Sequence, residues 1–185
     1  MSSTAVLHVD MDAFYVNVHL LDHGEDAGVP LVVGGQPDAR GVVTSASYEA
    51  RRHGVRSAMP TAQALRLCPS LKIVPPDWPR IRHCSQQVMA VLGEYGPLEK
   101  MSVDEAYVDV GQWDGAEGVA RAVFERVPAE TGLPCSVGLA TSKLVAKVAS
   151  DFNKPRGFTV VSPGAEAAFL APLPARAIWG IGPRT

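Results

Sequence analysis

The sequence contains little cysteine, and what it has is scattered. Its 185 residues include three cysteines, Cys68, Cys84 and Cys135, with no CxxC spacing among them. Closely paired cysteines are typical of structural zinc sites, and an even, regularly spaced set is typical of a disulfide framework. The pattern argues against both kinds of site, and it favours a reducing, cytoplasmic location.

Long apolar runs and a basic start are also missing. The segment MSSTAVLHVDMDAF has neither the positively charged beginning nor the apolar stretch of a signal peptide. No stretch approaches the roughly 20 apolar residues that a membrane-spanning helix needs. We therefore expect no membrane partner. Hydrophobic residues make up 46% and charged residues 19% of the chain, which is an ordinary balance for a globular protein.

The charge is small in total but unevenly distributed. Residues 40–82 contain eight Lys or Arg and two acids, a net charge of +6, whereas the whole chain carries −2 and the remainder therefore −8. A basic segment of this kind is either a solvated face or a surface that meets phosphate groups. The composition leaves both interpretations open.

Hydrophobic periodicity predicts strands and helices in alternation, interrupted by a basic insertion. An apolar strand, AVLHV, ends in acids, and two strands joined near residues 102–105 follow much later. Helices are expected over about 14–23, 78–95, 116–131 and 141–154, the last with Thr141 or Ser142 as its N-cap. The order predicts an α+β fold, an antiparallel-rich sheet backed by helices, with residues 20–77 as a small inserted lobe.

Acidic residues occur where two of these predicted strands end. Asp10 and Asp12 follow AVLHV, and Asp104 and Glu105 are adjacent between two β-rich runs. If the first strand pairs beside the later hairpin, Asp10 and Asp104 meet at one end of the sheet. Carboxylates gathered there require a cation, and oxygen ligands favour Mg²⁺ or Mn²⁺. Alternatively, Asp10 or Asp12 caps the following helix and Glu105 is solvated, and this alternative suits Asp12 well.

Carboxylates holding Mg²⁺ on a sheet, together with a basic lobe, indicate phosphoryl or nucleotidyl transfer. Two such ions activate an attacking oxygen and stabilise a leaving pyrophosphate. The protein then mainly positions the reactants and neutralises charge.

Four segments of the chain resemble the Y-family translesion DNA polymerases, and most of all their bacterial polymerase IV branch. They are HVDMDAFYVNV, TSASYEARRHGV, SVDEAYVDV and GLATSKLVAKVASDFNKPRG. The resemblance covers essentially the whole chain, and it implies template-directed, error-prone DNA synthesis in DNA repair and damage tolerance. It also implies a polymerase palm at 1–19 and 78–163, fingers at 20–77, and the start of a helix-hairpin-helix thumb at 164–185. The little finger is expected to be absent from this chain.

The same resemblance implies roles for individual residues. Asp10, Asp104 and Glu105 would be the catalytic, metal-binding carboxylates, and the Met11 carbonyl would complete the metal set. Tyr15 would exclude the ribose 2′-hydroxyl, although from its pattern alone it is a core residue of the first helix. The nucleotide-binding residues would be Phe14, Tyr15, Ser45, Tyr48, Arg51 and Lys154, with Asp12, Ser102 and Tyr107 in support.

The implied cofactors are two Mg²⁺ ions, with Mn²⁺ as an alternative, and the implied partners are primer–template DNA and a dNTP. A sliding clamp is expected for the full-length protein but not through this segment. A non-catalytic damage-response adaptor on a polymerase fold is the competing hypothesis, but such relatives lose the palm acids. A nucleotide cyclase would not explain SYEAR or GIGP. Whether the segment is active without the expected DNA-gripping parts is left open.

Overall fold

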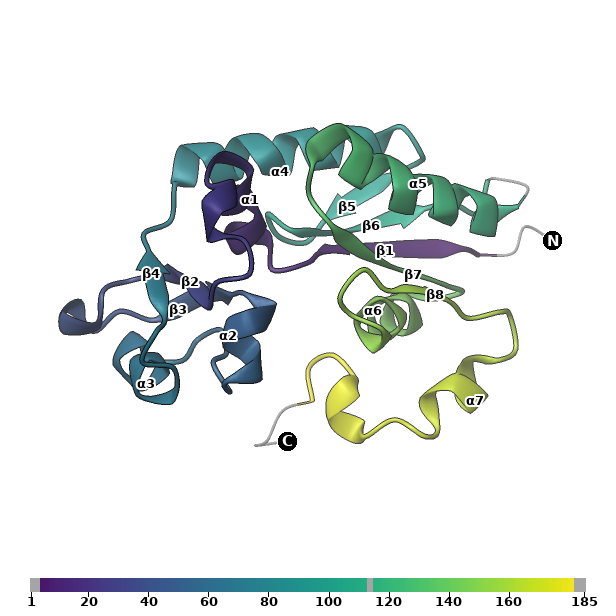
Figure 1. Cartoon of the computed structure of the whole chain (residues 1–185). Helices are drawn as coiled ribbons and strands as arrows, with labels where there is room; N and C mark the ends of the chain where they lie inside the picture. Colours follow the sequence, from purple (N-terminus) through teal and green to yellow (C-terminus); the bar gives the residue numbers. More distant parts are fainter. Residues whose placement is uncertain (1–3, 113–114, 182–185) are drawn as a thin grey trace. The chain divides into compact units, whose positions relative to one another are not determined.

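The computed structural model describes residues 4–112 and 115–181, and its contacts divide the chain into two compact units (Figure 1). The first unit comprises Met1–Asp12 and Ser85–Thr185. The second unit is the insertion Ala13–Cys84. In the described part of the chain, no helix combines the length and the apolar character needed to cross a membrane.

The first unit is built on a five-stranded sheet with β1 (Val6–Met11) at its centre. The strand order is β5-β6-β1-β7-β8, where β5 is Leu98–Lys100, β6 is Glu105–Asp109, β7 is Cys135–Ala140 and β8 is Phe158–Val160. All neighbouring strands are antiparallel except β7 and β8, which are parallel. The predicted α+β fold and its antiparallel-rich sheet are therefore confirmed. The first strand pairs beside the later hairpin, which was the condition for Asp10 and Asp104 to meet.

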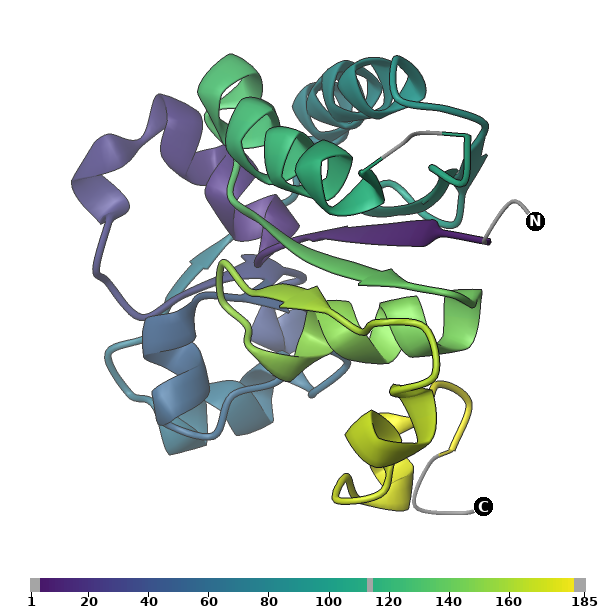
Figure 2. The ribbon, with the colours of Figure 1, turned by 90° about the vertical axis from the view of Figure 1, so that its right-hand side faces the viewer.

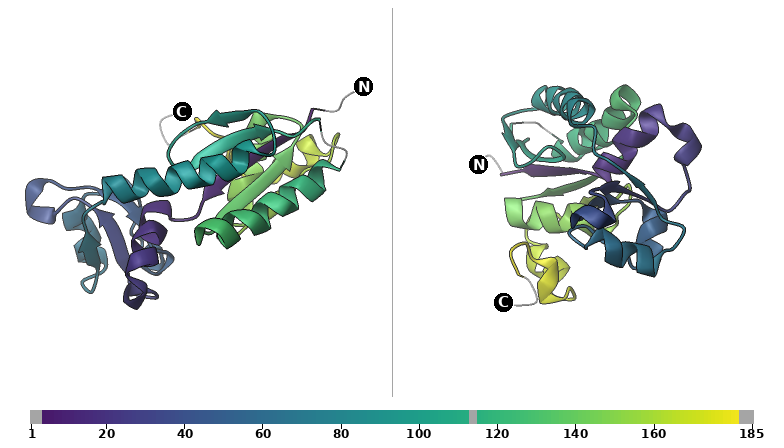
Figure 3. Two further views of the ribbon diagram at one scale, coloured as in Figure 1. Left: turned by 90° about the horizontal axis from the view of Figure 1, so that it is seen from above. Right: turned by 90° about the vertical axis from the view of Figure 1, so that its left-hand side faces the viewer.

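Helices cover both faces of this sheet (Figures 1 and 2). One face is covered by α5 (Ala116–Thr131) and the C-terminal half of α4 (Trp78–Gly93), which lie side by side in the view from above (Figure 3). The other face is covered by α6 (Lys143–Phe152), which Ser142 caps at its start. The apolar side of α6 buries Val145, Ala146 and Ala149 against the sheet. Beyond β8 follow α7 (Glu166–Leu170) and a 3₁₀ turn, η3 (Ala175–Ala177).

Gly138 of β7 brings α6 unusually close to the sheet. A Cβ atom at this position would lie 2.1 Å from the carbonyl oxygen of Ala146 and 2.4 Å from the amide nitrogen of Ser150. Only glycine permits such a close approach of two backbones. Gly138 is also the register partner of His8 in β1. As a result, Ser150 on α6 reaches the His8 ring through the place where a side chain would otherwise stand.

The second unit has a smaller sheet, in which β2 (Leu31–Gly34) lies between β3 (Val43–Ala46) and β4 (Lys72–Val74). Strand β2 is antiparallel to β3 and parallel to β4. The helices are α1 (Phe14–Asp22), α2 (Tyr48–Arg52) and α3 (Thr61–Leu67), with 3₁₀ turns η1 (Gly24–Asp26) and η2 (Pro37–Ala39). Asp26, whose side chain is 7% exposed, bonds Lys72 and His19 and so links η1 to β4 and α1.

The second unit, Ala13–Cys84, is longer than the segment 20–77 expected for the inserted lobe. It also contains α1 and the first residues of α4. Val16 of α1 is buried with Leu31, Val33 and Val74. The Trp78 ring at the start of α4 lies edge-on to Tyr15, 6.0 Å between centroids. The expected thumb start at 164–185 includes α7 and η3, whereas its last residues, 182–185, lie outside the described part.

Candidate active site

Three carboxylate residues lie at one end of the first unit's sheet, where β1 and β6 meet. Asp10 is the register partner of Glu105 across these antiparallel strands. The amide of Met11 donates a hydrogen bond of 2.9 Å to the carbonyl oxygen of Asp104. The pairing of β1 with β6 therefore brings together Asp10, Asp104 and Glu105, which are far apart in the sequence.

Asp104 is held by a tight local turn. The Ser102 hydroxyl donates a 2.5 Å hydrogen bond to Asp104 Oδ1. The same hydroxyl oxygen accepts the backbone N–H groups of Asp104 and Glu105, each at 3.2 Å. A serine bonded in this way replaces strand pairing with a turn. Ser102, which was expected to support the site, thus contacts Asp104 directly.

Asp10 is paired with a lysine of the loop that follows α6. Lys154 Nζ lies 2.7 Å from Asp10 Oδ1 and 2.8 Å from Asp151 Oδ1. Burial raises the pKa of Asp10 above its ordinary value, and Lys154 offsets only part of the rise. Burial lowers the pKa of Lys154, but Asp10 and Asp151 outweigh it, so the pKa of this lysine is raised. The ammonium group therefore stays charged beside Asp10.

Glu105 has two basic neighbours that its sequence context does not reveal. The buried His8 ring lies 3.6 Å away, measured from Nε2 to Glu105 Oε2, and Lys147 Nζ of α6 contacts the same oxygen at 2.5 Å. Stabilisation by His8 and Lys147 exceeds the opposing effect of burial and lowers the pKa of Glu105 to about 2. Glu105 is thus ionised throughout the neutral range.

The His8 ring is fixed from its other side by α6. His8 Nδ1 lies 2.7 Å from the Ser150 hydroxyl, which itself donates to the carbonyl oxygen of Lys147 at 2.8 Å. Nε2 faces Glu105 and is a buried nitrogen without a hydrogen-bond partner among the described atoms. Sequence reasoning missed His8 and Lys147, because their role depends on how closely α6 packs on the sheet.

The carboxylates of Asp10, Asp104 and Glu105 are chemically suited to bind a divalent cation, although in this structure they do not surround a common point. Within 4–112 and 115–181, no three His, Cys, Asp or Glu side chains gather so that they could hold a metal ion. Instead, ammonium groups contact two of the three acids, Asp10 and Glu105. These contacts place positive charge beside the acids. Carboxylate oxygens are also the ligands that Mg²⁺ and Mn²⁺ prefer.

The predicted nucleotide-binding residues, except Lys154, belong to the second unit. Ala13, with φ +42°, is the N-cap of α1, and no side chain caps this helix. The next residues are Phe14, which is buried, and Tyr15, whose ring lies edge-on to Phe14 at 5.7 Å. Ser45 is buried in β3. Helix α1 therefore begins with Phe14 and Tyr15, two of the residues expected to bind the nucleotide.

Tyr48 and Arg51 lie one turn apart on α2. The Arg51 guanidinium stands over the Tyr48 ring, 4.7 Å from its centroid. Arg51 Nε also donates to the carbonyl oxygen of Ala46 at 3.0 Å. Ser47 caps the helix by accepting the N–H of Ala50 at 3.1 Å. These contacts fix the guanidinium beside the phenol ring.

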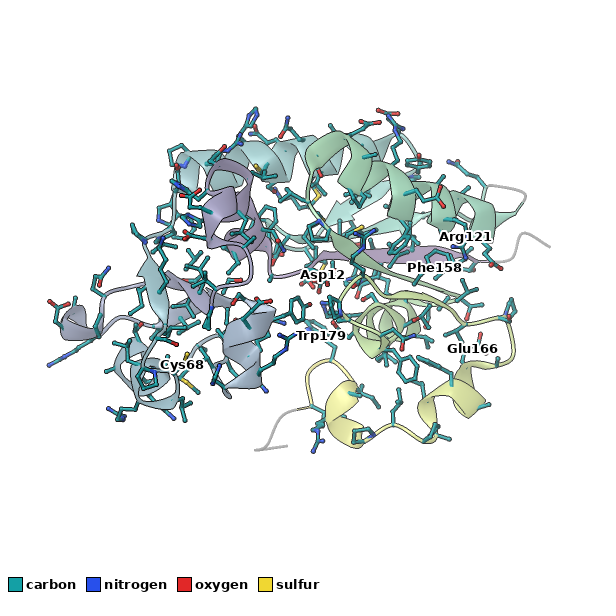
Figure 4. All side chains as sticks on the ribbon, in the orientation of Figure 1. Asp12, Cys68, Arg121, Phe158, Glu166 and Trp179 are labelled. Carbon is teal, nitrogen blue, oxygen red and sulfur yellow. The ribbon has the colours of Figure 1, made fainter. Side chains whose placement is uncertain are left out.

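Asp12 does not cap α1, so the capping alternative is wrong for this residue. Its Oδ1 accepts a hydrogen bond of 2.9 Å from the Ser136 hydroxyl of β7. Its Oδ2 accepts the backbone N–H of Arg156 at 2.8 Å. Local spacing predicted a cap because the helix starts two residues later, but the neighbouring strand and loop supply stronger partners. Figure 4 labels Asp12 where β1 ends.

Comparisons with known proteins place most of the chain in one family. A family model described as impB/mucB/samB matches residues 9–151. DNA polymerase IV of Alkalilimnicola ehrlichii is 46% identical over 190 residues, which cover 100% of this chain and 54% of that protein. For DNA polymerase IV of Methanoculleus marisnigri the identity is 47%, with 99% and 53% covered. The chain thus spans about half the length of these curated relatives.

Solved structures of similar proteins superpose on the chain. The crystal structure of DinB from Sulfolobus solfataricus does so with a TM-score of 0.91 at 33% identity, over 97% of this chain and 55% of that one. A structure described as an insertion ternary complex of Dbh DNA polymerase gives a TM-score of 0.90 at 32% identity, over 97% and 55%. The family match spans Asp10, Asp104 and Glu105.

Proposed function

The chain belongs to the impB/mucB/samB family of Y-family polymerases, and on that basis we propose that it carries the catalytic part of an error-prone, template-directed DNA polymerase. The reaction is nucleotidyl transfer from a dNTP to a primer end, in translesion synthesis. The palm would comprise residues 1–19 and 78–163 and the fingers residues 20–77, with the thumb starting near residue 164. The proposed location is the cytoplasm.

The acids at the β1–β6 end would bind the metal ions. Two Mg²⁺ ions, with Mn²⁺ as an alternative, supply activation of the primer 3′-hydroxyl and stabilisation of the leaving pyrophosphate. Asp10 and Asp104 would hold both ions, and Glu105 mainly one of them. The Met11 carbonyl oxygen would complete the set on the nucleotide side. Ser102 keeps the Asp104 carboxylate in place through its 2.5 Å hydrogen bond.

The family resemblance assigns the nucleotide contacts to Phe14, Tyr15, Ser45, Tyr48, Arg51 and Lys154. Arg51 presents a planar, permanently charged fork suited to phosphate oxygens, and its contact with Tyr48 holds the two side chains together. Lys154 would bind the triphosphate from the first unit. Tyr15 would exclude a ribose 2′-hydroxyl. The remaining residues of this proposed pocket are Phe14 and Ser45.

One observation carries the proposal. Asp10 and Glu105 are direct register partners beside Asp104, and a lysine ammonium contacts each of the two. A sheet end that gathers acids and pairs them with lysine ammonium groups is suited to exchange those cations for metal ions. In the family to which the chain belongs, that exchange would prepare the site for a triphosphate.

Primer extension tests the proposal directly. The 185-residue chain is incubated with primer–template DNA, dNTPs and Mg²⁺ at low salt, because contacts to DNA phosphates weaken as the salt concentration rises. We expect extension that disappears in Asp104→Ala. The matched control is Asp109→Ala, which removes an exposed carboxylate of β6, the strand that follows Asp104, and should leave extension unchanged.

Two other results have distinct meanings. Extension that persists in Asp104→Ala would contradict the assignment of the metal-binding acids. If neither protein extends the primer, a chimera that adds the C-terminal half of a curated relative tests whether further DNA contacts are needed. A chimera that is inactive even so would refute the proposed activity. The sliding clamp is a proposed partner of the full-length protein only.

A further inference from the structure

Asp12 anchors the backbone of the loop that follows α6. Its side chain is buried with 2% exposure, and Oδ2 accepts the N–H of Arg156 at 2.8 Å. Oδ1 accepts the Ser136 hydroxyl at 2.9 Å, and Ser136 Oγ in turn accepts the N–H of Gly157 at 3.0 Å. Two consecutive loop amides are thus bonded, one directly and one through Ser136, to a single buried carboxylate.

The loop needs such an anchor because its backbone is unfavourable locally. Arg156 has φ +53°, a left-handed conformation that costs a non-glycine residue roughly 1 kcal/mol or more. Gly157 is packed so tightly that a Cβ there would lie 2.9 Å from the carbonyl carbon of Asn153. Hydrogen bonds to a carboxylate are among the strongest that a backbone amide makes. Asp12 therefore stabilises a conformation that the loop would not hold alone.

The same loop carries Lys154, two residues before Arg156. The Lys154 ammonium group lies 2.7 Å from Asp10, which is in β1 and precedes Asp12 by two residues. One strand end thus holds the loop twice, since Asp10 contacts the lysine side chain and Asp12 contacts the backbone. If the loop were displaced, the Cα atom of Lys154 would move, and its ammonium group would no longer lie beside Asp10.

We propose that Asp12 is a positioning residue that acts through Lys154. It fixes the loop 153–157 so that the lysine ammonium reaches Asp10 and, if the proposed polymerase function holds, the triphosphate. Asp12 itself contacts neither the nucleotide nor the metal ions. The competing explanation is that Asp12 only stabilises the fold, in which case its effects would not depend on Lys154.

The first test needs no nucleotide. Lysine ¹⁵Nζ signals are recorded by NMR in the whole chain, and the Lys154 signal is assigned by its loss in Lys154→Met. In Asp12→Ala we expect the ion-paired Lys154 signal to shift and broaden, while that of Lys147 stays unchanged. Asp12→Asn should preserve the signal, because its oxygen still accepts from Arg156 and its amide donates to Ser136.

The second test is a double-mutant cycle on dNTP affinity, measured by equilibrium titration with Mg²⁺. We expect Asp12→Ala to weaken affinity about tenfold, the size of one charge-assisted hydrogen bond. The same change made in Lys154→Met should cost nothing further. Ser136→Ala is a milder second variant should Asp12→Ala fail to fold. Ser85→Ala, another buried serine of the first unit, serves as its control.

The outcomes separate this inference from the proposed function. An unchanged Lys154 signal, or an affinity loss that persists in Lys154→Met, would overturn the positioning role. A Lys154 signal that responds while the unmodified chain binds no dNTP would refute the polymerase proposal and still support the role of Asp12.

Discussion

Lys147 and Glu105, 42 residues apart in the sequence, form an ion pair of 2.5 Å at the end of the sheet. A metal ion bound by Glu105 must compete with this ammonium group. We therefore expect Lys147→Met to strengthen Mn²⁺ binding without nucleotide by several-fold, since one nearby charge is worth about 1 kcal/mol in water. Electron paramagnetic resonance of free Mn²⁺ measures the affinity.

The control for this prediction is Lys143→Met, one turn earlier on α6. Lys143 pairs with Glu99 at an exposed position and contacts none of the three acids in the described structure. Its removal should leave Mn²⁺ affinity within twofold. Unchanged or weaker binding in Lys147→Met would mean that the lysine does not compete with the metal ion.

Gly138→Ala should destabilise the first unit strongly. The new Cβ would lie 2.1 Å from a backbone oxygen of α6, so helix and sheet must separate. We expect a loss of about 3 kcal/mol in the free energy of unfolding. Gly118→Ala is the control, because a Cβ atom at this position of α5 meets open space. This substitution should raise the free energy of unfolding by about 0.5 kcal/mol. Urea titration of both variants decides, and equal effects would refute the close approach.

Asp26→Asn should show a pH-dependent effect within the second unit. Lys72 and then His19 lower the pKa of Asp26 below its ordinary value of 3.8. The ionised carboxylate therefore stabilises the fold fully above pH 3.8, and this contribution is lost as the pH falls through the lowered pKa. The stability gap between wild type and Asp26→Asn should be constant near pH 5 and should shrink below pH 3.8.

Exposed Asp38 provides the comparison, since Asp38→Asn should cause little change at any pH in this range. Urea titrations at several pH values measure the gap. A gap that is independent of pH down to strongly acid conditions would show that Asp26 is not held by these ionic contacts.

Tyr15→Ala should relax discrimination against ribonucleotides, provided that the proposed pocket forms. Loss of the ring opens space for a 2′-hydroxyl, and we expect the preference for dNTP over rNTP to fall by about 10²-fold. Tyr15→Phe retains the ring and should retain the preference. Single-nucleotide insertion with each substrate gives the ratio, and an unchanged ratio in Tyr15→Ala would place the sugar elsewhere.

Much of the sheet could be predicted because its signals are local. The apolar run before Asp10 and the β-rich runs around Asp104 and Glu105 predicted two strand regions whose acids meet, and the structure pairs them. The helix over 116–131 was recovered in full, since its apolar spacing is regular. The resemblance of four segments then supplied the family, which the comparisons confirm.

The contacts that tune the site could not be predicted in this way. Lys147 and Ser150 lie on α6, and the close packing of this helix at Gly138 determines which of its side chains face the sheet. The sequence does not reveal this packing, because a glycine in a strand can serve several structural purposes. Local spacing allowed Asp12 to cap the nearby helix, whereas its partners Ser136 and Arg156 are 124 and 144 residues away.

The central position of β1 has a consequence for protein synthesis. This strand is complete at Met11, but its partner β6 begins at Glu105 and its partner β7 at Cys135. At a translation rate of about 5–20 residues per second, β1 waits roughly 6–25 seconds for β7. Residues 13–84 complete their own contacts in that interval. The nascent chain therefore displays an apolar, unpaired strand beside a finished small unit, which makes it a substrate for chaperones at the ribosome.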